Sequence, residues 1–252
     1  MNPYETDKLL GEYLLFHYGS AQETAPPMPG LEAALDYPVR CVTECFDLDR
    51  LPGTARALDL GCAVGRSTFE LGRHCPEVVG IDFSKRFIDA AETIRRDGEL
   101  SYGRTDEGLL STALVARAPR EVDRRRVRFE TGDAMDLRAD LGSFDAVLMA
   151  NLIDRLADPQ RCLAQLGSLL NSGGQLVITS PYTWLEEFTP GAHWVGGFRR
   201  GDEFVRSLDG LHAALDGDFE LSDTRDLPFL IREHARKFQL SLAEASIWWR
   251  RQ

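Results

Sequence analysis

The chain has 252 residues, 43% of them hydrophobic, which suits one α/β domain with additions and excludes a wholly disordered protein. It carries 40 acidic residues against 29 Lys and Arg residues, a formal net charge of −11. Because such a surface repels nucleic acid backbones and anionic lipids, we expect no nucleic acid or membrane partner, but a small-molecule substrate.

The sequence also bears on location and metal content. No apolar run approaches the roughly 20 residues that a membrane helix needs, and the polar, acidic start differs from a secretory signal. We therefore expect a cytoplasmic protein. The five cysteines lack paired C-x-x-C spacing, and Cys41 and Cys45, one helical turn apart, do not build a zinc site alone. Reduced thiols and no metal are expected.

Residues 1–50 are predicted to form an N-terminal helical cap. Leu10, Tyr13, Leu14 and His17 have the spacing of one helix face, and a proline-rich break at 25–30 precedes a second helical stretch that runs to about Phe46. Tyr13 and His17 therefore suit buried core positions about as well as ligand positions.

Residues 55–180 alternate short apolar runs with helical patterns. Helices are expected from near Ser67, after an N-cap at Ser84, and at Asp158-Pro159, where a cap precedes proline. Strands are expected at 57–60, 78–81, 127–130, 144–150 and 175–179. This alternation predicts an α/β fold with a doubly wound, mostly parallel sheet, seven-stranded if the C-terminal strands join it.

Residues 181–252 are predicted to complete a single domain spanning 1–252. The runs 219–225 and 238–242 alternate with period two and could add an antiparallel pair to the sheet edge. Segments 98–126 and 181–210 are longer than the sheet requires, and such connections are usually functional or mobile. Segment 181–210 follows a strand end where ligands bind, so it suits a substrate lid or, equally, a surface loop with packed aromatic residues.

A turn after the first expected strand carries the strongest chemical signal. It reads Asp59-x-Gly61-x-Ala63-x-Gly65, and acids follow at Asp82 and Asp133 after the next two strands. Glycines allow a cofactor to approach the backbone, and an acid closing the second strand can bond both ribose hydroxyls. A dinucleotide fingerprint has a third glycine, which we do not find. The acid before Gly61 fits the cationic methionine end of S-adenosylmethionine (SAM) better than a pyrophosphate.

With these motifs, residues 55–180 resemble the class I SAM-dependent methyltransferases. The departure is Ala63, where that family usually has glycine. The resemblance implies SAM as the cofactor, S-adenosylhomocysteine as its product, and no metal. The residues implied to bind SAM, with Asp133 near the adenine amino group, are Asp59, Gly61, Ala63, Gly65, Asp82, Phe83, Asp133, Ala134 and Asn151.

The N-terminal run from Tyr4 to Gly19, Tyr-Glu-Thr-Asp-Lys-Leu-Leu-x-Glu-Tyr-Leu-Leu-Phe-His-Tyr-Gly, carries a closer resemblance. It is similar to the start of the methyltransferase domain of ovothiol biosynthesis, as are 105–108, 180–184 and 248–250. The resemblance implies a stand-alone enzyme that methylates an imidazole ring nitrogen of 5-thiohistidine (mercaptohistidine). It also implies a functional link to a sulfoxide synthase and a lyase.

For this reaction we hypothesise that Tyr, His and carboxylate side chains orient the imidazole and amino acid ends of the acceptor. His17, Tyr13 and Asn151 are the catalytic candidates, with His17 preferred as proton acceptor or orienting base. The substrate-binding candidates are Tyr4, Tyr13, His17, Asp154, Tyr182, Trp184 and Glu187. Alternatives are a SAM-dependent enzyme acting on another small-molecule N, O or S acceptor, an NAD-dependent oxidoreductase and a non-catalytic SAM-binding protein. The methylated nitrogen and the oligomeric state stay open.

Overall fold

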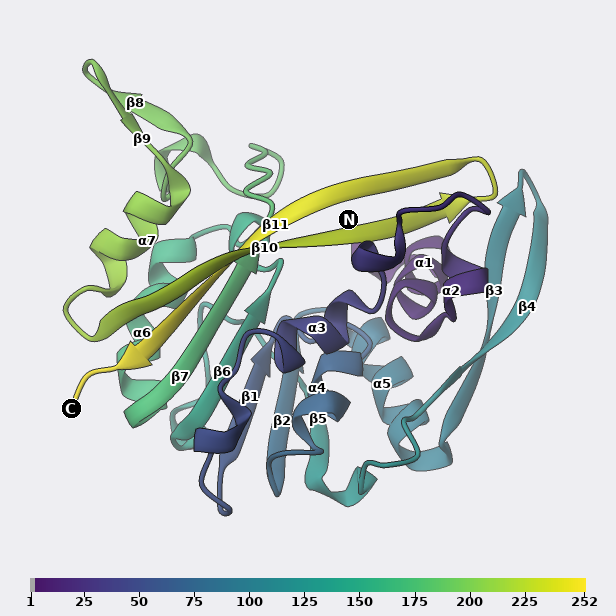
Figure 1. Ribbon diagram of the computed structural model, residues 1–252, viewed down its shortest axis with the longest axis horizontal. Coiled ribbons are helices and arrows are strands. Elements are labelled where there is room, and N and C mark those ends of the chain that lie inside the picture. Colours follow the sequence, from purple (N-terminus) through teal and green to yellow (C-terminus); the bar gives the residue numbers. More distant parts are fainter. Residues whose placement is uncertain (1–2) are drawn as a thin grey trace.

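A computed structural model describes residues 3–252, and a seven-stranded sheet forms its centre (Figure 1). The strand order is β10-β11-β7-β6-β1-β2-β5. The strands of this sheet are β1 (Arg56–Leu60), β2 (Glu77–Asp82), β5 (Val127–Thr131), β6 (Phe144–Ala150), β7 (Leu170–Ser180), β10 (Phe219–His234) and β11 (Lys237–Arg250). The first five are parallel, and β10 and β11 add an antiparallel pair beside β7. The predicted fold class is confirmed.

Helices cover both faces of the sheet because strand side chains alternate between two apolar cores. Ala57 and Val78 contribute to one core, whereas Leu58 and Val79 contribute to the other. The first core also takes side chains from α1 (Asp7–Tyr18), α3 (Tyr37–Thr43), α4 (Arg66–Leu71) and α5 (Lys85–Asp97). The second takes them from α6 (Pro159–Leu169) and α7 (Ser207–Leu215).

The shorter helices lie mainly in the connections. They are α2 (Ala21–Thr24), η1 (Pro3–Glu5), η2 (Glu32–Ala34), η3 (Leu48–Arg50), η4 (Arg124–Arg126), η5 (Ala139–Leu141), η6 (Ile153–Arg155) and η7 (Gly191–His193). Two predicted N-caps are confirmed: the Ser84 hydroxyl accepts a hydrogen bond from the amide of Phe87, and the Asp158 carboxylate accepts one from the amide of Arg161. Within residues 3–252, every helix is too short or too polar to span a lipid bilayer.

The strand order places a switch point beside β1. The chain leaves β1 for β2 on one side and later returns to β6 on the other. In open α/β sheets, ligands bind in the crevice at such a point, outside the carboxyl ends of the strands.

The long segment 98–126 contains a hairpin that the sequence did not predict. Its strands are β3 (Glu99–Glu107) and β4 (Leu110–Arg117), which form a separate two-stranded sheet. The hairpin lies beside α1 and the far end of β10, and the amide of Ala235 donates to the carbonyl of Asp106 (Figure 1). This hairpin and β10 therefore support the N-terminal helix.

Segment 181–210 is largely irregular. Besides η7, it contains a small hairpin, β8 (Phe198–Arg200) with β9 (Glu203–Val205), and the start of α7. It follows β7, as expected of a segment near the ligand-binding edge.

Candidate active site

A cavity of about 410 Å3 lies at the carboxyl ends of β1, β2, β5 and β6, the edge at which the switch point occurs. This volume falls within the range of small-molecule sites. Of the residues predicted for the site, eleven line the cavity: Tyr4, Tyr13, His17, Gly61, Ala63, Asp82, Phe83, Asp133, Ala134, Asn151 and Glu187. Asp59, Gly65, Asp154, Tyr182 and Trp184 are not among the lining residues.

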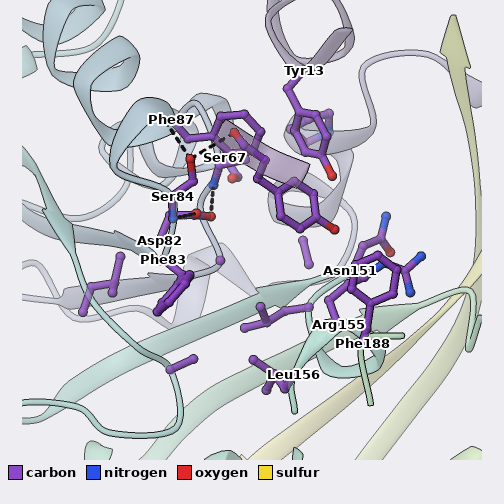
Figure 2. A pocket seen from close by; sticks show the side chains of 18 of the residues that line it. Tyr13, Ser67, Asp82, Phe83, Ser84, Phe87, Asn151, Arg155, Leu156 and Phe188 are labelled. Atoms are coloured by element: carbon purple, nitrogen blue, oxygen red, sulfur yellow. Dashed lines mark hydrogen bonds between the residues drawn. The ribbon is translucent and has the colours of Figure 1, made fainter. Parts of the chain in front are cut away.

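The Asp82 carboxylate is fixed at one side of the cavity by two backbone amides. Oδ2 accepts from the amide of Ala63 at 2.9 Å, and Oδ1 accepts from the amide of Ser84 at 2.8 Å (Figure 2). Each carboxylate oxygen can accept more than one hydrogen bond, so both oxygens retain acceptor capacity toward the cavity. Burial raises the pKa of Asp82 to about 6, against the lowering effect of these amides.

Two further residues on the Asp82 side suit an adenine ring. Phe83 lines the cavity although its side chain is 67% exposed, so its ring offers an uncovered flat surface. Asp133 accepts from the amide of Met135 through Oδ1 at 2.8 Å, and Ala134 lies between them in the same turn. The adenine ring of an adenosine could therefore contact the face of Phe83 and donate a hydrogen bond to the Asp133 carboxylate.

The turn after β1 has the backbone conformation that its sequence suggested. Gly61 and Ala63 both have left-handed φ angles, +73° and +47°, and both line the cavity. A non-glycine residue in this region is uncommon and concentrates at functional sites. Gly65 instead caps α4, and a Cβ there would lie 2.5 Å from the Phe129 ring. Gly65 thus shapes the turn through packing.

Asp59 lies beneath the cavity wall and is fully buried. Its Oδ2 accepts hydrogen bonds at 2.7 Å from the hydroxyls of Ser67 and Thr68, and Ser67 lines the cavity. Its Oδ1 has no hydrogen-bond partner within residues 3–252, a costly state that an ammonium group or water would relieve. Burial raises the pKa of Asp59 to about 6. The predicted acid, Asp59, therefore does not line the cavity itself, but it hydrogen-bonds to Ser67, which does.

Aromatic side chains from η1 and α1 cover the cavity. Tyr4 and Tyr13 meet edge-to-face at 6.0 Å, and the ring of Phe87 lies 4.7 Å from that of Tyr13. Figure 2 shows the Tyr13 hydroxyl directed into the cavity. Burial raises the pKa of both tyrosines, so each stays protonated at neutral pH. These groups can donate hydrogen bonds and exclude water, but they are poor bases.

His17 also lines the cavity, and its tautomer is constrained by a backbone contact. Nδ1 accepts from the amide of Arg66 at 3.4 Å, which places the proton of the neutral ring on Nε2. Burial, with a smaller contribution from the Arg66 charge, lowers the pKa of His17 to about 3. A neutral imidazole with Nδ1 engaged is a hydrogen-bond donor through Nε2. This geometry favours an orienting role over the predicted proton-acceptor role.

Tyr37, which the sequence analysis did not select, fixes the orientation of Asn151. Its hydroxyl donates to Asn151 Oδ1 at 2.8 Å and lies 2.6 Å from the hydroxyl of Thr179. Asn151 itself has a left-handed φ of +51°, and its backbone N–H donates to the carbonyl of Thr179. Because Oδ1 accepts from Tyr37, the side-chain NH2 group of Asn151 is the part that can donate a hydrogen bond to a ligand in the cavity.

Arg155 is a second cavity residue that the sequence analysis missed. It follows Asp154, which is fully buried, and the two side chains form a 3.0 Å ion pair. Burial raises the pKa of Asp154, while Arg155 opposes that shift. Asp154 therefore supports Arg155 and does not itself line the cavity.

Two residues expected in a lid lie in contacts away from the cavity. The Tyr182 hydroxyl donates to Glu244 at 2.9 Å, and the Trp184 indole donates to Ser207 at 2.9 Å. From segment 181–210, Glu187 and Phe188 line the cavity instead. Within residues 3–252, no group of three or more His, Cys, Asp or Glu side chains is arranged to hold a metal ion.

The pKa of Asp82 gives a pH dependence that can be measured. If ribose hydroxyls donate to the ionised carboxylate, the Kd for S-adenosylhomocysteine should rise about tenfold between pH 7 and pH 5, because a pKa of about 6 leaves the group mostly protonated at pH 5. Calorimetry in two buffers of different ionisation enthalpy should also detect proton release on binding below pH 6. A Kd that stays constant over this range would contradict the assignment.

The same shift has the opposite sign for the unliganded fold. The pKa of Asp82 is raised above its unfolded value near 4, so its contribution to stability is present below about pH 4 and is lost as the pH rises through 6. Ligand binding and unliganded stability thus respond to Asp82 protonation in opposite directions.

Comparison with known proteins adds a family match over the sheet core. Residues 58–176 match the family model described as a methyltransferase domain. A curated relative, O-methyltransferase cnsE from Penicillium expansum, is 30% identical over 122 residues, which are 48% of this chain and 36% of that enzyme. The chain thus spans about a third of that relative's length.

Solved structures share the fold over more of the chain. A SAM-dependent methyltransferase from Methanosarcina mazei matches with a TM-score of 0.52 and 20% identity, covering 81% of this chain and 95% of that one. The [4+2]-cyclase SpnF matches with a TM-score of 0.56 and 17% identity, covering 98% of this chain and 96% of that one. Because a cyclase and a methyltransferase share this fold, the site must decide the activity.

Proposed function

We propose that this chain, whose core is a methyltransferase domain of the class I SAM-dependent type, transfers a methyl group from SAM to an imidazole ring nitrogen of 5-thiohistidine. One observation carries the proposal. The N-terminal run on which the resemblance to ovothiol biosynthesis depends is the segment that covers the cavity, and it supplies Tyr4, Tyr13, Phe16 and His17 to the lining.

The cofactor half of the cavity fits SAM. Asp82 offers two carboxylate oxygens to ribose hydroxyls, and Phe83 and Asp133 offer an aromatic face and an acceptor to adenine. Gly61, whose φ is left-handed, lines the cavity at this turn, and Asp59 beneath it accepts a hydrogen bond from the lining residue Ser67. SAM, when bound, supplies an electrophilic methyl group on a sulfonium, whose sulfur keeps the electron pair of the broken bond.

The acceptor half suits a nucleophile that is already neutral. An imidazole nitrogen is mostly unprotonated at neutral pH, since its ordinary pKa is about 6.5. Tyr13 and Tyr4 are held protonated and His17 presents an N–H, so these buried groups can orient a ring but not deprotonate a phenol. The side-chain nitrogen of Asn151, which also lines the cavity, adds a further donor. The chain's contribution is therefore orientation and exclusion of water.

Orientation also has to select nitrogen over sulfur. The thiol of the substrate, when ionised, is a better nucleophile than the ring nitrogen. The chain would exclude sulfur methylation by holding the flat ring between aromatic side chains, with donors from His17 and Asn151 fixing its rotation. The proton on the other ring nitrogen would then leave to solvent or to the exposed Glu187 at the cavity.

The direct test is product analysis with SAM and thiohistidine. We expect S-adenosylhomocysteine and a methylated product whose fragmentation places the methyl group on the imidazole ring. Histidine, which has the same imidazole and amino acid groups but lacks the thiol, serves as the comparison acceptor. A methyl group on sulfur, or no product at a SAM concentration that saturates the site, would refute the proposal.

Methylation of a hydroxyl on another small molecule is the second candidate. It is favoured by the curated relative, whose name is that of an O-methyltransferase. A hydroxyl acceptor needs a base, and Glu187 is the exposed carboxylate at the cavity that could serve. Phenols and catechols assayed beside thiohistidine would separate the two candidates by their kcat/KM values.

Replacing His17 with Gln should lower turnover about tenfold while the Kd for S-adenosylhomocysteine stays within about twofold, since one oriented hydrogen bond to the acceptor is lost. Steady-state kinetics and calorimetry check the two parts separately. His74→Gln, at an exposed position after α4, is the matched control and should behave like the wild type. Unchanged turnover in His17→Gln would dismiss the role of His17.

A further inference from the structure

We propose that Arg155 binds the carboxylate of the acceptor, so that the enzyme requires an acceptor with an amino acid-type carboxylate beside its ring. This inference rests on the proposed function, because it names the part of the acceptor that the aromatic side chains leave unbound.

Three acceptors around one nitrogen, Nη1, hold the guanidinium of Arg155 in place. Nη1 donates to the carbonyl of Asp154 at 2.9 Å, to Asp154 Oδ2 at 3.0 Å and to the carbonyl of Thr183 at 3.0 Å. A guanidinium has five N–H donors, so the three on Nε and Nη2 are not committed to these acceptors, and two remain after one serves the Tyr4 hydroxyl. Two such donors can bind a carboxylate in a bidentate manner.

Two neighbours fix the plane of the group. Arg155 Cζ lies 4.9 Å from the centroid of the Phe188 ring, and the Arg155 side chain donates a hydrogen bond to the Tyr4 hydroxyl oxygen. Asp154 is itself held, since its Oδ2 also accepts from the amide of Thr183 at 2.9 Å. A fixed guanidinium loses little freedom when it binds a ligand, which favours a recognition role.

Charge distribution points to the same role. Arg155 is the only Lys or Arg residue among the cavity-lining residues of the described chain, and His17 is neutral. The other charged lining groups are the carboxylates Asp82, Asp133 and Glu187. An anionic group entering this cavity therefore has one place where it meets a positive charge.

The carboxylate could belong to the acceptor or to the methionine part of SAM, and position favours the acceptor. Figure 2 shows Asp82, Phe83 and Ser84 on one side of the cavity and Asn151, Arg155 and Phe188 on the other. The turn from Gly61, which the methionine part would follow, leads to Ser67, whereas Arg155 comes from η6 after β6. Arg155 thus belongs to the acceptor half.

The test compares two acceptors in the full chain: thiohistidine and its decarboxylated analogue, thiohistamine. The wild type should prefer the carboxylated acceptor by about 100-fold in kcat/KM and in Kd measured with S-adenosylhomocysteine present. Arg155→Met should reduce that preference to about threefold or less, mainly through KM, and Arg155→Lys should keep part of it. Arg161→Met removes an arginine outside the cavity and should keep the full preference.

Each outcome decides the inference. A preference retained in Arg155→Met overturns it. So does a large rise in the Kd for S-adenosylhomocysteine in that variant, because the carboxylate would then be that of the cofactor. If the wild type does not methylate thiohistidine, the proposed function fails, and the two binding constants still decide the role of Arg155. Thermal unfolding of each variant confirms that it is folded.

Discussion

Replacing Asp82 with Asn should weaken binding of S-adenosylhomocysteine by about 100-fold or more, because two hydrogen bonds to a charged acceptor are each worth about 1.5–3 kcal/mol. The carboxylate accepts from the amides of Ala63 and Ser84 through separate oxygens. Asn has one oxygen, so its NH2 group must face one of those amides. The variant therefore loses the acceptors for ribose and disturbs the turn that holds the cofactor.

Calorimetry with S-adenosylhomocysteine measures this loss, and Asp89→Asn is the matched control. Asp89 lies on α5, pairs with Lys85 at 2.6 Å and is 63% exposed, so its replacement should leave the Kd unchanged. The pH dependence predicted above should disappear in Asp82→Asn, because the group that titrates is removed. Wild-type affinity in this variant would show that the cofactor is held elsewhere.

Replacing Gly61 with Val should abolish measurable cofactor binding, with a Kd raised by at least about 100-fold. Gly61 has a φ of +73°, and a Cβ there would lie 2.8 Å from the side chain of Leu152 at the cavity wall. A β-branched residue in this conformation costs about 1–3 kcal/mol, and its side chain would clash with Leu152 and distort the cavity proposed to hold the cofactor.

The cost in stability and the loss of binding can be separated with Gly30→Val. Gly30 has a similar φ of +87°, and a Cβ there would meet nothing within 4 Å. Both variants should therefore lose stability in urea unfolding, while only Gly61→Val should lose binding. Equal binding in the two variants would mean that the turn after β1 does not contact the cofactor.

The parallel core could be predicted because its strands are short buried apolar runs. β6 has the predicted bounds, and β1, β2 and β5 differ from the prediction by one residue at one or both ends. The β3–β4 hairpin was missed because its side chains, such as Glu99 and Arg117, are mostly polar or only half-buried and give a weak apolar pattern. The C-terminal strands were recognised but run longer: the added residues of β10 extend toward α1, and most of those of β11 pair with β7.

Site residues could be predicted where they belong to a local sequence motif. They were missed where tertiary contacts determine their role. Asp82 and Gly61 line the cavity because strand ends place them there. Tyr37 and Arg155 carry no signal of their own in the sequence, since their roles depend on Asn151 and Asp154. Position near the end of β6 is the one clue that could have singled out Arg155.

Tyr182 was predicted to bind the substrate, but its side chain lies outside the cavity. It follows β7, at the edge where ligands bind, yet its hydroxyl reaches Glu244 on β11. That partner is 62 residues further along the chain, so local pattern could not reveal it.

We propose that one cavity holds the cofactor against Asp82 and the acceptor beneath the N-terminal aromatic residues. A crystal structure of the protein with S-adenosylhomocysteine measures this most directly. We predict that both ribose hydroxyls lie within hydrogen-bond distance of the Asp82 carboxylate, with the sulfur facing the space bounded by Tyr13, His17 and Asn151. Ligand density outside this cavity, or an Asp82 carboxylate turned away from the ribose, would contradict the account.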